Sequence, residues 1–202
     1  MPYFPIFIDL CGKPCLIVGG GAVAARKAEK LLPYGPVLTV VAPEVCDALD
    51  AMEGVTLLRR EFVPEDLDGI ALVIAAATPE VNGAVSALCQ GKNIPVNAVD
   101  DRENCTFLFP ALVRKGELSV GISTGGASPS AAVWVRDRVE DCLPDGLDAI
   151  LDFLQQVRPL VKEQVVEENR RSRFFAALFS ACMERGRPLT WAELAEFLEV
   201  SS

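Results

Sequence analysis

Short apolar runs alternate with helical stretches between residues 14 and 100, and this alternation constrains the fold more than any other feature. The runs are rich in Val, Ile and Ala, which is typical of strands that are covered on both faces. Strands separated by helices predict βαβ units and a parallel sheet. We expect strands at 14–19, 37–42, 55–59, 70–76 and 94–99, and helices at about 22–33, 44–51 and 79–91. The predicted fold class is α/β, with a Rossmann-type doubly wound parallel sheet.

The second half of the chain follows a different pattern. Two extended runs, 107–113 and 118–123, flank a short turn with a glycine, which predicts an antiparallel hairpin. A helix over about 129–142 follows, with Ser128 as its N-cap. The remainder, about 147–200, is expected to be helical.

A glycine-rich loop joins the first predicted strand to the first helix. It has the form Gly-x-Gly-x-x-Ala, with Gly19, Gly21 and Ala24 at the three marked positions. In dinucleotide-binding folds the first glycine allows a tight turn, the second lets the backbone approach a pyrophosphate, and the small third residue lets helix and strand pack closely. The pyrophosphate then lies on the free N–H groups of the helix N-terminus. Because the motif stands between a strand and a helix, it predicts a dinucleotide site, with an ordinary strand-to-helix turn as the alternative.

The end of the second predicted strand bears on the choice between NAD and NADP. An acid that binds the ribose is expected there, and Glu44, after Pro43, comes about two positions late. No Arg or Lys stands immediately after the strand to hold a 2′-phosphate, which favours NAD. Glu44 is equally well explained as a first-turn residue stabilised by the dipole of the following helix.

The chain contains no histidine, and this excludes several kinds of active site. Without imidazole there is no Ser-His-Asp triad, Cys-His pair or His-ligated zinc, so catalysis falls to carboxylates, hydroxyls, thiols or a cofactor. A net charge of −9 disfavours nucleic acid and anionic membranes as partners. The seven cysteines never form a Cys-x-x-Cys pair, and no signal-like or membrane-length apolar run is present, so a reducing cytoplasm is the expected location.

Six short blocks follow one another along the first two thirds of the chain. They are residues 5–7 (PIF), 16–27 (LIVGGGAVAARK), 75–78 (AAAT), 97–100 (NAVD), 107–111 (FLFPA) and 123–129 (STGGASP). In this order and spacing the chain resembles precorrin-2 dehydrogenase, the sirohydrochlorin-forming module of siroheme synthase. The resemblance implies NAD-dependent oxidation of precorrin-2, a polycarboxylated tetrapyrrole, to sirohydrochlorin. It also implies a homodimer.

The resemblance further assigns roles to individual residues. Asp100 is implied to be the acid–base residue, since loss of hydride leaves an electron-poor macrocycle that must shed a proton. The alternative for Asp100 is that it caps the loop that follows it, and the neighbouring Asp101 is not expected to take the catalytic role. Substrate contact is implied for Thr124, Gly125 and Gly126. Cofactor contact is implied for Gly19, Gly20, Gly21, Ala22, Val23, Pro43, Glu44 and Thr78.

The predicted organisation is in three parts. These are an NAD-binding domain (1–105), a dimerisation and substrate-site element (106–144) and a helical C-terminal domain (145–202). Within the last, residues 158–187 carry seven basic against four acidic side chains. This basic segment is a candidate for contacts to the substrate carboxylates, because Arg pairs with carboxylates in a bidentate manner. A solvated helical face is an equal alternative.

Two other functions remain open. Some members of the family also insert iron or cobalt into sirohydrochlorin, and a metallochelatase with weak NAD use is one alternative. No protein-held metal site is expected, because the ring nitrogens are the principal ligands. The other alternative is a non-catalytic NAD-sensing module, which would bind NAD without turnover.

Overall fold

The computed structural model describes residues 3–201 and divides into two compact units, Met1–Phe109 and Pro110–Ser202. Met1, Pro2 and Ser202, at the ends of the first and last predicted domains, lie outside the described residues. The predicted three-part organisation stays a prediction.

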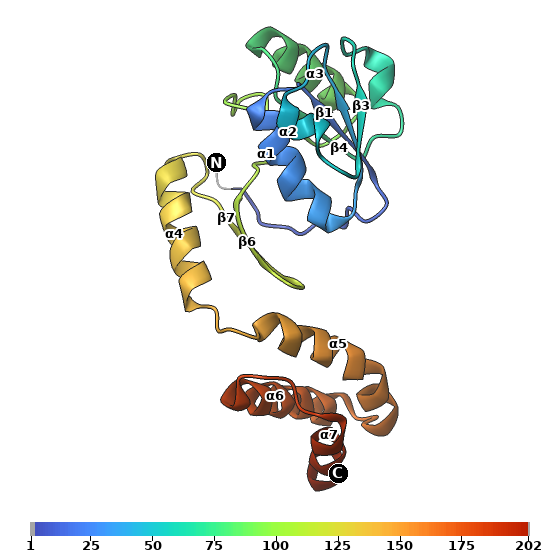
Figure 1. Cartoon of the computed structure of the whole chain (residues 1–202), viewed down its shortest axis with the longest axis vertical. Helices are drawn as coiled ribbons and strands as arrows, with labels where there is room; N and C mark the ends of the chain where they lie inside the picture. The colour runs from blue at the N-terminus through green and yellow to red at the C-terminus, as the bar shows by residue number, and fades with distance from the viewer. Residues whose placement is uncertain (1–2, 202) are drawn as a thin grey trace. The chain divides into compact units, whose positions relative to one another are not determined.

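The first unit is built on a five-stranded parallel sheet (Figure 1). Its strands are β1 (Pro14–Val18), β2 (Val37–Val41), β3 (Val55–Leu58), β4 (Leu72–Ala75) and β5 (Val96–Ala98). They lie in the order β3-β2-β1-β4-β5, so the direction of winding reverses between β1 and β4. The predicted Rossmann-type sheet is confirmed, and the ends of each strand fall within two residues of the predicted ones. In such a sheet, ligands bind beyond the carboxyl ends of the strands where the order reverses.

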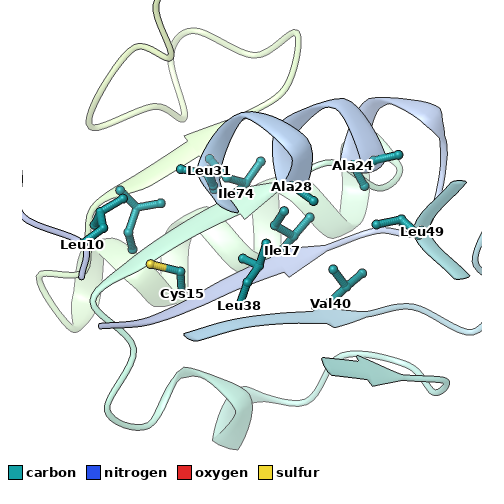
Figure 2. Packing of buried hydrophobic residues seen from close by; sticks show 12 residues of the cluster. Leu10, Cys15, Ile17, Ala24, Ala28, Leu31, Leu38, Val40, Leu49 and Ile74 are labelled. Atoms are coloured by element: carbon teal, nitrogen blue, oxygen red, sulfur yellow. The ribbon is translucent and has the colours of Figure 1, made fainter. Parts of the chain in front are cut away.

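Helices cover both faces of this sheet. Successive strand residues point to opposite faces. On one face, Ile17 packs in a cluster with residues of α1 (Ala22–Leu31) and α2 (Asp47–Asp50), as Figure 2 shows. On the other face, Leu16 packs in a cluster with residues of α3 (Pro79–Gly91). This two-sided burial explains why the strands contain almost no polar side chains.

Two helix boundaries differ from the prediction. The first helix ends at Leu31, and a short 3-10 turn η1 (Leu32–Tyr34) that contains Pro33 follows it, because proline cannot continue the ladder of helical hydrogen bonds. The second helix was predicted from residue 44 but begins only at Asp47. The backbone before it is drawn onto the glycine loop, where the Cys46 N–H donates to the Gly20 carbonyl at 2.8 Å. A second 3-10 turn, η2 (Pro64–Leu67), precedes β4.

The second unit begins with the predicted antiparallel hairpin. Its strands are β6 (Ala111–Lys115) and β7 (Leu118–Ile122), joined by a tight turn at Gly116. The first strand was predicted to start at residue 107, and this is wrong. Phe107 and Phe109 instead pack against the core of the first unit, and the hairpin forms only beyond them.

Four helices complete the second unit. They are α4 (Pro129–Cys142), α5 (Leu147–Gln164), α6 (Glu168–Arg185) and α7 (Trp191–Ser201). The predicted N-cap of α4 is confirmed, because the Ser128 Oγ accepts from the Ala131 N–H at 3.1 Å. Residues of α5, α6 and α7 share one apolar cluster. None of the helices formed by residues 3–201 is long and apolar enough to span a membrane.

Candidate functional site

Four segments with predicted cofactor or catalytic residues follow strands of the parallel sheet. The glycine loop follows β1, Pro43 and Glu44 follow β2, Thr78 follows β4, and Asp100 follows β5. Because the strands are parallel, all four segments lie at the carboxyl edge of the sheet, which is the edge where Rossmann folds bind ligands. The structure therefore gathers the predicted residues of the first unit at one edge. Thr124, Gly125 and Gly126 belong to the second unit.

The three glycines of the loop have different reasons to be glycine. A Cβ on Gly19, whose φ is +127°, would overlap the Ala76 carbonyl oxygen, and a Cβ on Gly20 would overlap the carbonyl oxygen of Glu44. Packing within the protein thus requires both. A Cβ on Gly21 would have no atom within 4 Å. The protein leaves the space beside Gly21 open, and this is the position where the motif brings backbone close to a pyrophosphate.

The N-terminus of α1 is equipped for an anion. Gly21 is its N-cap, no side chain caps the helix, and its first turn holds no acidic residue. The first N–H groups of a helix have no partner within the helix. Those of Ala22 and Val23 can therefore donate to a phosphate, with the positive end of the helix dipole behind them. The residues present fit a dinucleotide.

The structure bears on one of the two explanations of Glu44. Because α2 begins at Asp47, Glu44 lies outside the first helical turn, whose acidic residues are Asp47 and Asp50. The prediction that Glu44 is a first-turn residue of this helix is therefore wrong, and its contact with the ribose stays a prediction. The Glu44 side chain is exposed, and its backbone carbonyl lies against Gly20.

Thr78 is the N-cap of α3, and its Oγ1 accepts from the Val81 N–H at 3.5 Å.

The buried side-chain amide of Asn82, which sequence reasoning missed, supports the same loop. The Asn82 Oδ1 accepts from the Ala77 N–H at 2.9 Å, and its Nδ2 donates to the Ala77 carbonyl at 3.4 Å. The signal that could have found it is a single amide side chain on the buried face of an apolar helix.

Asp100 stands in an unusual backbone conformation. It is the third residue of a turn closed by a hydrogen bond from the Asp101 N–H to the Ala98 carbonyl, at 3.4 Å, and its φ is +58°. A left-handed conformation costs a residue with a Cβ about 1 kcal/mol or more, and such strain concentrates at functional sites. The Asp100 side chain is exposed, and its carboxylate accepts no hydrogen bond from residues 3–201.

The neighbouring acid behaves differently. The Asp101 carboxylate accepts from the Asn104 backbone N–H at 3.3 Å and from its Nδ2 at 2.6 Å. The amide of Asn104 holds the pKa of Asp101 below its usual range. Asp101 is therefore the residue that caps the loop, and the carboxylate of Asp100 is left available.

A lysine near Asp100 was also missed as a site residue. The Lys27 ammonium on α1 lies 3.9 Å from the centre of the Phe109 ring, within cation–π range, and forms none of the ion pairs of the described chain. Burial lowers the pKa of Lys27 to about 8. The charged or titratable groups that act on it are, in decreasing order, Lys30, Cys105, Arg26 and Asp100. Only the folded chain brings α1 to this loop, so no local signal could have shown the contact.

The Thr124 hydroxyl closes its own loop. Its Oγ1 donates to the Ser128 carbonyl at 3.0 Å and accepts from the Ser128 N–H at 3.1 Å. Gly125 and Gly126 have φ values of +63° and +84°, a conformation that glycine adopts without strain. The hydroxyl and the two glycines together set the shape of this loop.

Several arginines of the basic segment have partners within the second unit. Arg187 forms a bidentate pair with Glu193, at 2.9 and 2.8 Å. Arg171 donates to the carbonyls of Val165 and Val166 at the end of α5, at 3.1 and 3.2 Å. These two guanidinium groups hold the helices together. Within residues 3–201, no group of three or more Cys, Asp or Glu side chains is arranged to hold a metal ion.

Comparison with known proteins gives matches along the chain. Residues 6–111 match the family described as putative NAD(P)-binding, and residues 115–141 match the family described as sirohaem biosynthesis protein central. The siroheme synthase of Photorhabdus laumondii is 39% identical over 184 residues, which are 89% of this chain and 39% of that protein. The siroheme synthase of Neisseria meningitidis serogroup B is 37% identical over 210 residues, which are 100% of this chain and 44% of that protein. The chain thus spans less than half the length of these relatives.

A solved structure extends the likeness to the whole fold. The precorrin-2 dehydrogenase SirC superposes with a TM-score of 0.78 at 25% identity, and the match covers 98% of both chains. These comparisons confirm the resemblance and the fold class that the sequence predicts. They also support the predicted use of NAD.

Proposed function

The chain belongs to the putative NAD(P)-binding family, and from that premise we propose that it oxidises precorrin-2 to sirohydrochlorin with NAD. The observation that carries the proposal is the state of Asp100, an exposed and unbonded carboxylate in a strained turn at the edge of the sheet that also presents the open glycine loop. Its relatives support it, since the similar solved structure is a precorrin-2 dehydrogenase and the similar sequences are siroheme synthases.

The residues that would hold NAD follow from the loop geometry. The N–H groups of Ala22 and Val23, beside the open space at Gly21, bind the pyrophosphate. Glu44 accepts hydrogen bonds from the adenosine ribose, and its negative charge disfavours the 2′-phosphate of NADP. Pro43, Gly19, Gly20 and Thr78 shape the walls of this site. When bound, NAD supplies the acceptor for a hydride.

Asp100 supplies the base for the second half of the oxidation. A hydride leaves one carbon of the macrocycle with its electron pair, and the neighbouring position must lose a proton so that the new double bond forms. An Oδ atom of Asp100 takes that proton and, being exposed, releases it to water. The loop of Thr124, Gly125 and Gly126 contacts the tetrapyrrole in this proposal.

An anaerobic assay of NADH formation from precorrin-2 tests the proposal. We expect turnover by the unaltered chain, and we expect Asp100→Asn to lower kcat about 10²- to 10⁴-fold while the Kd for NAD stays the same, because the amide cannot accept the proton. Glu103→Gln, which removes an exposed carboxylate from the same loop, is the matched control and should retain activity. Full activity of Asp100→Asn would refute the assignment of the base.

The same preparation separates the alternatives. NAD binding with no turnover would indicate a sensing module. Insertion of Fe(II) or Co(II) into sirohydrochlorin without NAD, in a protein that forms no NADH, would indicate a chelatase. We also propose that Fe(II) or Co(II) is inserted into sirohydrochlorin after the oxidation, because some members of the family that the chain resembles perform this step.

Homodimerisation and a cytoplasmic location also belong to the proposal. Three large apolar side chains of α4, Val133, Trp134 and Val135, are exposed in the single chain, which supports burial against a second copy. All seven cysteines are free thiols, which supports a reducing compartment.

A further inference from the structure

The thiol of Cys105 ties together the loop that carries Asp100. Its Sγ lies 3.1 Å from the Ala98 carbonyl oxygen and 3.1 Å from that of Asp101. It also accepts hydrogen bonds from the Ala98 N–H at 3.2 Å and from the Asn97 Nδ2 at 3.4 Å. Ala98 and Asp101 are the two ends of the turn in which Asp100 stands. One sulfur atom therefore bonds to both ends of the turn.

The protonation state of this thiol matches its contacts. Cys105 is half-buried, and burial raises the pKa of its thiol, so the S–H stays in place at neutral pH. The S–H can donate to one of the two carbonyls, while the sulfur lone pairs accept from the two nitrogen donors. Each bond to sulfur is weak, but all of them act within a single turn.

The backbone on both sides of Cys105 is itself anchored. The Ser86 Oγ of α3 donates to the Asn104 carbonyl at 2.5 Å. Thr106 bonds to Val96 of β5 through its backbone N–H, at 2.9 Å, and through its Oγ1, at 2.8 Å. Cys105 lies between the anchored residues Asn104 and Thr106. Its sulfur is therefore held in place, and its hydrogen bonds restrict the motion of the turn.

We propose that Cys105 is a positioning residue for the oxidation, because its thiol holds the strained turn that aims Asp100. This inference rests on the proposed function of Asp100. A positive φ at an aspartate persists only where the surroundings determine it, and the sulfur supplies the bonds that do so. Without the hydrogen bonds of the Cys105 sulfur, the turn can relax. The Asp100 carboxylate is then still present but displaced from the position that the reaction requires.

A simple packing role makes a different prediction. If Cys105 served only as a small apolar group, Ala or Val would replace it better than Ser would. If its hydrogen bonds matter, Ser would replace it better than Ala or Val, because a hydroxyl donates and accepts in the same place. The ranking of the three variants therefore separates the two roles.

The test measures kcat and KM for precorrin-2 and the Kd for NAD in Cys105→Ser, Cys105→Ala and Cys105→Val. We expect Ala and Val to lower kcat about tenfold, because small displacements of a reacting group are costly, with the Kd for NAD unchanged. Ser should restore kcat to within about threefold of the unaltered protein. Cys11→Ala, an exposed thiol far along the chain from this loop, should have no effect. Equal activity of the Ala and Ser variants would overturn the proposal.

Amide hydrogen exchange gives a readout that needs no turnover. Peptides that cover residues 98–105 should exchange faster in Cys105→Ala than in Cys105→Ser. If the unaltered chain fails to oxidise precorrin-2 while this contrast appears, the proposed function fails and the structural role of the thiol stands. If the exchange rates are equal in the two variants, the role of the thiol fails whatever the enzyme does.

Discussion

The glycine loop after β1 and the acid loop after β5 lie at the same edge of the sheet, but they are built in opposite ways. The glycine loop depends on absent side chains, since Gly21 leaves open space and no side chain caps the helix behind it. The acid loop, residues 99–105, depends on side chains that form hydrogen bonds within the loop. Cys105 and Asp101 hold the turn around Asp100 in this way. Under the proposed function, cofactor binding is thus a property of exposed backbone, and placement of the base is a property of a side-chain network.

This contrast predicts that a new side chain at Gly21 abolishes binding without disturbing the fold. In Gly21→Asp the carboxylate would occupy the open space and repel the pyrophosphate. We expect the Kd for NAD to rise about 100-fold or more, while the Tm changes little because a Cβ there meets no atom within 4 Å. Calorimetric titration with NAD and thermal unfolding measure the two quantities.

Gly19→Ala is the matched control for that prediction. Its Cβ would strike the Ala76 carbonyl from a backbone with φ +127°, so this variant should lose stability first. If Gly21→Asp bound NAD normally, the loop would not be the pyrophosphate site and the contrast between the two loops would be lost.

The features that were predictable from sequence are those with a local physical cause. The strands follow from apolar runs that can be buried only in a sheet covered on both faces, and the glycine loop follows from its place between a strand and a helix. The N-cap at Ser128 is equally local, because a side chain bonds to a backbone group three residues away.

The features that were missed or wrong depend on contacts that the apolar pattern does not encode, and some of these contacts join residues distant in the chain. Phe107 and Phe109 have the pattern of a strand, but the core of the first unit takes them up, and the hairpin starts later. Lys27 meets Phe109 only when the fold brings α1 to the segment after β5. Asn82 and Cys105 bond to residues within eight positions of themselves, but these bonds form only in the folded conformation of the loops after β4 and β5. The position of Asp100 in a left-handed turn was not predicted from the sequence NAVD, because aspartate is among the residues that tolerate positive φ but does not require it.

A second prediction tests whether the charge of Lys27, which lies outside the acid loop, contributes to substrate binding beside Asp100. Lys27 is charged below a pH of about 8 and neutral above it, because its pKa is lowered to that value. Under the proposed function, its ammonium would attract a polyanionic substrate toward Asp100 only while it is protonated. We expect the KM for precorrin-2 to rise about two- to fivefold as the pH passes through 8.

The Lys27→Arg variant is the control for this titration, because guanidinium stays protonated throughout the range. Its KM should remain flat between about pH 7 and pH 9, while Lys27→Met should show the raised KM at every pH. Lys30→Met, on the exposed side of the same helix, should keep the rise but move it to a higher pH, because the charge of Lys30 lowers the pKa of Lys27. A KM that rises equally in Lys27→Arg would assign the titration to another group.

The smallest expected effect concerns the backbone strain of a non-glycine residue at positive φ, which occurs at Asp100 in the acid loop but not in the glycine loop. Asp100→Gly should relieve about 1 kcal/mol of backbone strain at φ +58° and lose about 0.5 kcal/mol through the greater freedom of glycine in the unfolded chain. The net gain of roughly 0.5 kcal/mol corresponds to a Tm about 1–2 °C higher for a chain of this size. Asn93→Gly, at the other non-glycine residue with positive φ among residues 3–201, is the control outside the acid loop and should keep full activity. A variant at Asp100 that is more stable and inactive would show that the turn is strained for the sake of its carboxylate, whereas a less stable one would show that the carboxylate itself supports the turn.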